Sequence, residues 1–291
     1  MPGWHACFER LVITLPKTLP LVDMNSKKSL LRRLDDLPTG LIVSVSFLIL
    51  LAIWHLVVVW GEYPRFILPG PVDVARQSTV LIQDGRLLRH TLITLSEVVP
   101  GLIIGALVAM PLGYLLAKSP LAERLISPYL IASQAIPVIA IAPLLTIWIQ
   151  SWYWSRVLVA VLVVFFPVLI NTIAGLRSVP SHFYDLMYSL RATPFQIFSK
   201  LEFPAALPTL LTGLKVGATL AVIGALVGEF VQPRSQGLGF LLVTARYQFR
   251  TDTVFVVLVA LGFMALSLYG LVVLIERRLL RWRSYGNGNV S

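Results

Sequence analysis

Six long apolar blocks make up most of this sequence. A helix that crosses a hydrocarbon core about 30 Å thick needs roughly 20 apolar residues, which is about the length of each block. None of the blocks alternates between polar and apolar residues as a barrel strand does, and a spanning segment must satisfy its own backbone, so each block predicts a helix. The blocks are residues 41–60, 98–117, 129–149, 157–176, 208–230 and 254–275. The sequence therefore predicts an all-α polytopic membrane protein with six transmembrane helices.

Positive charge between the blocks indicates how the chain is oriented. Sixteen of the 24 Lys and Arg residues lie on segments that face inward when both termini are cytoplasmic, and eight lie on the outward segments. Cytoplasmic loops carry an excess of Lys and Arg, so we expect a cell-membrane protein with both termini inside. The expected parts are a cytoplasmic segment over 1–40, a first transmembrane helix over 41–60, an external loop and interfacial segment over 61–97, a transmembrane core over 98–275 with an inner loop at 177–207, and a cytoplasmic tail over 276–291.

The N-terminal segment shows no secretory signal, because it lacks an apolar core followed by a small-residue cleavage site. The first apolar block is therefore expected to remain as an anchor. Met24 precedes the basic stretch NSKKSLLRRLDDLP, which is typical of the residues just inside a first span. We hypothesise that translation starts at Met24; an intact mass that includes residues 1–23 rejects this.

Composition excludes several other classes of protein. The single cysteine, Cys7, rules out an intramolecular disulfide and a cysteine metal site, and the four histidines have no ligand spacing, so neither a metal nor a cofactor is expected. The basic residues lie at the ends of the spans and not on a soluble domain, which argues against nucleic-acid binding. The spans contain no paired carboxylates or H-E-x-x-H motif for a membrane-embedded enzyme. A secondary transporter that needs no ATPase remains an alternative.

A half-polar segment, DLMYSLRATPFQIFSKLEFPAALP, lies between the fourth and fifth blocks. Apolar residues recur at helical spacing from Phe183 to Leu190, which predicts a short amphipathic helix. Thr193 and Gln196 form a capping box around Pro194, which predicts a second helix that ends at Pro204 and Pro208. Such a helix pair either rests on lipid headgroups or fills a groove of a soluble partner, and periodicity does not decide between the two.

Three polar residues inside the apolar blocks are candidates for a substrate pathway. A carboxylate within a span, such as Glu229, usually faces a cavity or a partner, although this one also fits an interfacial glutamate that water already reaches. Gln134 and Asn171 are explained equally well by hydrogen bonds between helices and by contact with a solute.

The half-polar segment resembles the signature loop of the permease subunits of bacterial ABC importers. That loop has the pattern Glu-Ala-Ala, three residues, Gly, nine residues and Ile-x-Leu-Pro. Asp185 takes the place of the Glu, Leu186 and Met187 replace the alanines, Arg191 replaces the Gly, and Leu201, Phe203 and Pro204 form the closing group. A residue with a Cβ in place of that Gly costs about 1 kcal/mol or more if the turn is left-handed.

The resemblance extends over residues 85–282 through HTLITLSEVVPGLIIGALVAMPLGYLLAKS, LKVGATLAVIGALVGEF and IERRLLRW. It is strongest to the nitrate, sulfonate, taurine and vitamin branch, with riboflavin as the first choice of solute and a thiamine pyrimidine precursor as the next. It implies a type I ABC importer permease fold in which residues 181–204 form a coupling helix that docks on a separate ATPase. The residues implied at that contact are Asp185, Leu186, Met187, Arg191, Phe195, Phe198, Leu201, Phe203 and Pro204.

The resemblance also implies partners. These are two copies of an ABC ATPase, an external solute-binding protein, and a second permease as a homodimer or heterodimer, all in contact with membrane lipid. In keeping with a separate ATPase, the sequence contains no G-x-x-x-x-G-K-[ST] phosphate-binding loop. The nucleotide chemistry is therefore expected on another chain, and this chain is not expected to be an enzyme.

Overall fold

A computed structural model describes residues 39–232 and 236–281. The Met24 hypothesis, the segment before residue 39 and most of the expected tail lie outside the described residues. The chain divides into two units, residues 1–57 and 58–291. The described part of the first unit is most of helix α3 (Thr39–Trp60), which coincides with the first predicted span.

The second unit is all-α, as expected, because the described residues contain no strand. Its elements are α4 (Pro71–Gln83), α5 (Arg86–Lys118), α6 (Pro120–Gln134), α7 (Val138–Ile149), α8 (Trp152–Arg177), α9 (Ser181–Ser189), α10 (Pro194–Ile197), a π-helical turn η1 (Phe198–Glu202), α11 (Phe203–Val231), α12 (Leu238–Tyr247) and α13 (Thr251–Leu279). With α3, the described residues form five helices that are long and apolar enough to span a membrane, or six spans if α6 and α7 are counted as one.

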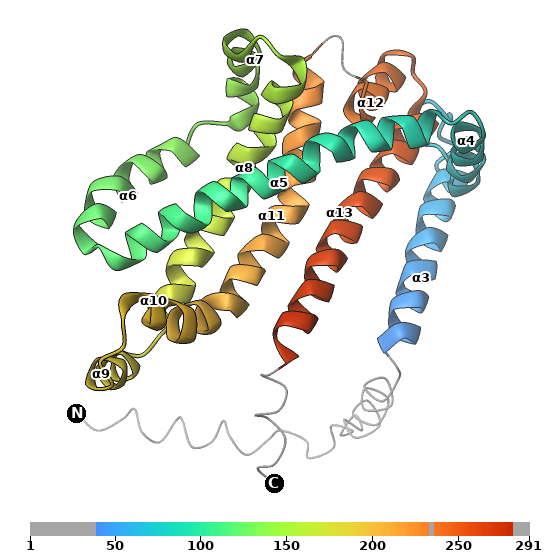
Figure 1. The fold of residues 1–291 in the computed structure, drawn as a ribbon. Coiled ribbons are helices and arrows are strands. Elements are labelled where there is room, and N and C mark those ends of the chain that lie inside the picture. The colour runs from blue at the N-terminus through green and yellow to red at the C-terminus, as the bar shows by residue number, and fades with distance from the viewer. Residues whose placement is uncertain (1–38, 233–235, 282–291) are drawn as a thin grey trace, which may run out of the picture. The chain divides into compact units, whose positions relative to one another are not determined.

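The core of the second unit forms where α5, α8 and α11 cross, and α13 packs beside them (Figure 1). Small residues allow the close approach of these helices. A Cβ on Gly101 of α5 would lie 2.5 Å from the Cβ of Ala160 on α8, and a Cβ on Gly224 of α11 would lie 2.7 Å from the Cα of Ala160. Van der Waals packing of this kind is a main source of helix association in lipid, so these glycines set the spacing of the bundle.

The third predicted span, residues 129–149, is not one straight helix. The chain forms α6 and α7, which are bent by 96° at the break between them. Pro137 lies at the break with extended backbone angles, and it cannot donate the hydrogen bond that a continuous helix requires there. Proline also disfavours helical geometry at the preceding residue, which here is Ile136. The apolar composition predicted a stretch long enough for one span, but it concealed the bend between the two helices.

Two other predicted boundaries differ from the structure. The second span was expected to start at residue 98, whereas α5 begins at Arg86. The prediction that Pro204 and Pro208 end the second short helix is wrong, since helical structure continues for 38 residues from Pro194 to Val231. The π-helical turn explains the continuity at Pro204, because its wider i to i+5 spacing relieves the clash that this proline makes with the preceding turn of a regular helix. Pro208 lies within the regular helix α11.

Candidate functional site

The helix pair α9 and α10 lies at one end of the second unit, where the ends of α8 and α11 meet (Figure 1). The apolar side chains of α9 do not turn into the core: Leu186 is 55% exposed, and Phe183 and Asp185 are also exposed. Met187 is half-buried. The segment therefore offers a mixed apolar and acidic face outside the bundle.

The turn between the two helices is left-handed at Arg191, with φ = 54°. The backbone N–H of Arg191 donates to Tyr188 O at 2.9 Å, and that of Ala192 donates to Met187 O at 3.0 Å. These two bonds are the pattern of a Schellman motif, in which glycine usually occupies the left-handed position. Arg191 thus keeps the geometry that the signature-loop glycine would adopt and carries its conformational cost.

The predicted capping box of α10 is confirmed. Thr193 Oγ1 accepts from the Gln196 N–H at 3.4 Å, and Gln196 Oε1 accepts from the Thr193 N–H at 2.8 Å. Pro194 occupies the first helical position, where its missing N–H has no cost. Backbone hydrogen bonds and caps therefore define the whole path from α9 to α10.

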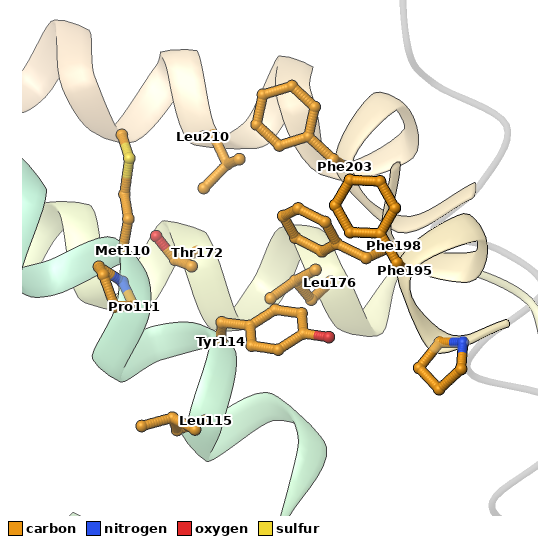
Figure 2. A pocket seen from close by; sticks show the side chains of 11 residues that line it. Met110, Pro111, Tyr114, Leu115, Thr172, Leu176, Phe195, Phe198, Phe203 and Leu210 are labelled. Atoms are coloured by element: carbon orange, nitrogen blue, oxygen red, sulfur yellow. The ribbon is translucent and has the colours of Figure 1, made fainter. Parts of the chain in front are cut away.

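A cavity of about 680 Å³ opens between this segment and the spans. Figure 2 shows Phe195, Phe198 and Phe203 along one side, with Tyr114 of α5 and Thr172 of α8 among the residues opposite. The hydroxyl of Thr172 donates to Val168 O at 2.7 Å within its own helix, so it can act toward a solute only as an acceptor. Phe195 is 76% exposed, which leaves it available to a partner outside the chain.

Glu202 is a site residue that the sequence prediction missed. Its side chain is fully buried, although it follows the half-buried Leu201 and precedes the partly exposed Phe203 and half-buried Pro204. Lys118, the last residue of α5, donates to Glu202 Oε1. A signal was present, since a carboxylate in an apolar segment needs a charged or hydrogen-bonding partner, but that partner lies too far along the chain to be named.

Two tyrosines complete the surroundings of Glu202. Tyr114 Oη donates to Glu202 Oε2 at 3.3 Å, and Tyr184 of α9 places its ring 5.1 Å from Lys118 Nζ. Burial, and then the negative charge of Glu202, raise the pKa of Tyr184 to about 12. Tyr184 therefore remains neutral, and the charged groups of this cluster are Glu202 and Lys118.

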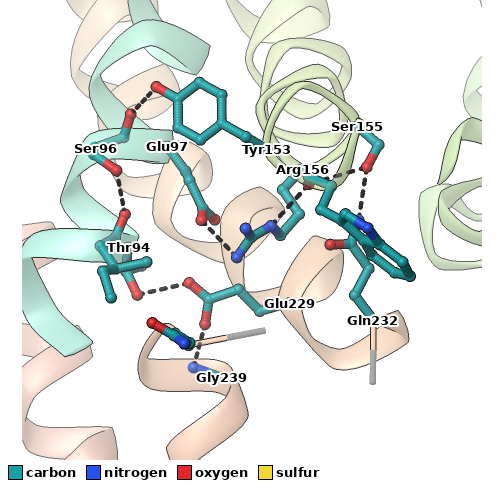
Figure 3. Close-up of polar contacts among 12 residues, drawn as sticks. Thr94, Ser96, Glu97, Tyr153, Ser155, Arg156, Glu229, Gln232 and Gly239 are labelled. Carbon is teal, nitrogen blue, oxygen red and sulfur yellow. Dashed lines mark hydrogen bonds and ion pairs between the residues drawn. The ribbon is translucent and has the colours of Figure 1, made fainter. Parts of the chain in front are cut away.

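The predicted pathway residue Glu229 lies at the opposite end of α11, where it is 1% exposed. Figure 3 shows its carboxylate between Thr94 and Gly239: Thr94 Oγ1 donates to Glu229 Oε1 at 2.7 Å, and the Gly239 N–H donates to Oε2. The hydroxyl of Thr94 also accepts from the Leu238 N–H at 2.8 Å. Glu229 thus holds the first turn of α12 against α5, and it is not an interfacial glutamate exposed to water.

A buried ion pair stands beside Glu229. Arg156 Nη1 of α8 lies 2.7 Å from Glu97 Oε1 of α5, with side chains only 10% and 0% exposed (Figure 3). Next to it, Gln232 Nε2 donates to Ser155 Oγ at 2.6 Å. Neither charged residue was among the predicted site residues, although opposite charges near the ends of two apolar blocks were a usable signal.

The other two pathway candidates do not join this cluster. Gln134 is the exposed last residue of α6, next to the bend. Asn171 is half-buried and donates from Nδ2 to Pro167 O at 2.8 Å within α8. A Cβ on Gly213 of α11 would lie 2.6 Å from the Asn171 Cβ, so Asn171 packs against α11. A role in the pathway stays a prediction for each of the three residues.

Comparisons with known proteins all find similarity to the membrane components of transport systems. The family model described as binding-protein-dependent transport system inner membrane component matches residues 101–281. The riboflavin transport system permease protein RibX of Chloroflexus aurantiacus is 40% identical over 270 residues, which cover 93% of this chain and 100% of that protein. The formylaminopyrimidine transport permease protein ThiX of Halalkalibacterium halodurans is 35% identical over 82% of this chain and 95% of its own length.

A solved structure supports the fold. The chain is similar to an inward-facing structure of the MetNI methionine ABC transporter, with a TM-score of 0.58 over 66% of this chain and 95% of the solved one. The sequence identity is 20%, so this likeness concerns the arrangement of the helices alone.

Proposed function

Because the chain belongs to the family of binding-protein-dependent transport system inner membrane components, the permeases of type I ABC importers, we propose that it forms the membrane path of an ATP-driven riboflavin importer. The family expected from the signature-loop resemblance is confirmed. The observation that carries the choice of solute is the similarity to the riboflavin permease, which extends over that protein's full length. The runner-up is a formylaminopyrimidine, a thiamine precursor, in line with the similarity to the ThiX permease.

The second part of the proposal concerns residues 181–204, which we assign as the segment that docks on an ABC ATPase. Its support is geometric. An apolar stripe that faces away from the core, with Leu186 and Phe195 exposed, is the kind of surface that fills a partner's groove. The Schellman turn and the capping box define one backbone conformation, and a segment of defined shape transmits displacement better than a loop does.

In this mechanism a pair of ATPase subunits closes on ATP and draws two such segments together, one from each of two permease copies. The attached spans then switch the path from inward-facing to outward-facing, which is the rocking geometry of alternating access. An external solute-binding protein delivers the solute to the other end of the bundle. The end with α9 and α10 is therefore assigned to the cytoplasm, in keeping with the positive charge counted from the sequence.

The proposed solute is tested with the purified permease, its ATPase and its binding protein in vesicles. Riboflavin fluorescence inside the vesicles should rise with ATP, and taurine or a formylaminopyrimidine should not compete for uptake. Uptake of the pyrimidine with no uptake of riboflavin would show that the pyrimidine is the solute and would leave the proposal of an ATP-driven importer intact. Accumulation of any solute without nucleotide would overturn the importer itself.

A further inference from the structure

We propose that Glu202 and Lys118 are positioning residues: Glu202 holds the ammonium of Lys118 against α9, and Lys118 thereby forms a third attachment between the coupling segment, residues 181–204, and the spans. This inference rests on the proposed coupling function of that segment. It assigns to one ion pair the task of making α5 follow the segment when the ATPase moves it.

The connections of the segment to the bundle show why a third attachment matters. The polypeptide joins α9 to α8 through residues 178–180, and it joins α10 to α11 through the π-helical turn η1. A body held at two points still rotates about the line between them. The bond between Lys118 and Glu202 ties the second of these connections to a different helix, α5. The ammonium held there also contacts the ring of Tyr184 on α9, away from both chain connections, and this contact opposes the rotation.

The chemistry of the pair makes it a firm attachment. The side chain of Glu202 is 1% exposed, whereas that of Lys118 is 41% exposed. A buried carboxylate without a partner is strongly unfavourable, so Glu202 holds the ammonium wherever the segment moves. An exposed pair would lack this property, because water replaces either partner at little cost.

Aromatic rings add to the attachment from both sides. Lys118 Nζ lies 5.8 Å from the ring centre of Tyr114 and 5.1 Å from that of Tyr184, within the range of cation–π attraction. The Tyr114 ring also meets Phe198 edge to face, with ring centres 5.2 Å apart. The last turn of α5, the first short helix and the π-helical turn therefore converge on one ammonium group.

The π-helical turn places Glu202 where the pair requires it. Such turns are rare within helices and occur mostly at functional sites. Here the Phe203 N–H donates to Phe198 O across five residues, immediately before Pro204. The same widening that accommodates the proline thus also fixes the position of Glu202 relative to α5.

Distances between spin labels test the attachment without reference to any solute. Labels are placed at Leu107 on α5 and Tyr188 on α9, which are 66% and 63% exposed, after Cys7, the one cysteine of the sequence, is replaced by Ser. The permease is measured with its ATPase in lipid, both without nucleotide and trapped with ATP and vanadate. We expect the same narrow distance in both states for the native pair, and a broadened or shifted distance for Glu202→Gln. An unchanged distance in Glu202→Gln would overturn the proposal.

Coupling is then measured as riboflavin moved per ATP hydrolysed. Glu202→Gln and Lys118→Gln should lower this ratio about fivefold or more while ATP hydrolysis continues, because they loosen a link between two sites. The exchange Lys118→Glu with Glu202→Lys should recover part of the ratio. Tyr114→Phe, which removes only one hydrogen bond, serves if Glu202→Gln does not assemble, and should lower the ratio to a smaller extent.

The matched control is Glu276→Gln, which breaks the part-buried Lys215–Glu276 pair between α11 and α13. It should leave both the label distance and the ratio as they are; an equal loss in both variants would show a general effect of removing an ion pair and would contradict the proposal. A native complex that hydrolyses ATP but moves no riboflavin would rule out riboflavin as the solute. The label distances would still test the attachment, because they do not depend on the solute.

Discussion

Gly237 lies so close to Glu229 that a Cβ on the glycine would be 1.8 Å from the Glu229 Oε1 atom. No side chain fits at this position unless the carboxylate moves away from the first turn of α12. Glycine is therefore required here by contact, although its own φ of −83° is open to any residue.

Gly237→Ala should lower the free energy of unfolding by about 1–3 kcal/mol, the usual effect of adding a methyl group to a packed site. Thermal unfolding of the detergent-solubilised protein measures the loss. The control is Gly262→Ala in α13, where an added Cβ meets nothing within 4 Å. Equal thermal stability of the two variants would contradict the position of Glu229.

Breaking the buried pair between Glu97 and Arg156 should lower the free energy of unfolding more than Gly237→Ala does. Glu97→Gln removes the carboxylate that contacts the guanidinium in a buried site, and breaking a buried ion pair costs about 3–5 kcal/mol. Replacing both residues with Gln should cost less than the single change does. Asp84→Asn, which breaks an exposed pair with Arg86, should leave the unfolding midpoint unchanged. A double variant less stable than the single one would argue against an ion pair at this place.

Arg191→Gly should stabilise the turn between α9 and α10 by about 0.5–1 kcal/mol, because glycine adopts the left-handed conformation without the strain of a Cβ. Arg191→Ala keeps the Cβ and should bring no gain, which separates relief of backbone strain from loss of the charged side chain. Chemical or thermal unfolding of the purified permease distinguishes the two. The interpretation fails if alanine stabilises the protein as much as glycine does.

Phe195→Asp should abolish co-purification of the ATPase and leave the stability of the permease unchanged. The side chain is 76% exposed, so folding depends little on it, whereas a docking groove lined by apolar residues would reject the carboxylate. Tyr247→Asp is the matched control, because Tyr247 is an aromatic residue of similar exposure, 71%, in α12. If the Phe195→Asp variant still co-purifies with the ATPase, the ATPase does not dock on this segment.

Local features of the sequence predicted local structure well. Apolar length located the spans, and the Thr193 and Gln196 side chains form the expected capping box. Proline was the main source of error. Pro137 breaks an apolar run that looked continuous, whereas Pro204 was expected to end a helix and is instead accommodated by a π-helical turn. Whether a proline ends, bends or widens a helix depends on what packs against it, which no single stretch of sequence reveals.

The polar clusters were less accessible to prediction. Glu229 was recognised as a carboxylate inside a span, but its partners Thr94 and Gly239 lie on other helices. Lys118 and Glu202 are 84 residues apart in the chain. A buried charge implies that a partner exists, and only the packing of the helices identifies it.

The most direct test of the account measures riboflavin uptake and ATP hydrolysis together, in vesicles that hold the permease with its ATPase and binding protein. The account predicts uptake that requires hydrolysable ATP and stops when Phe195→Asp replaces the native permease. Uptake that persists without hydrolysis, or that is unaffected by Phe195→Asp, would contradict it.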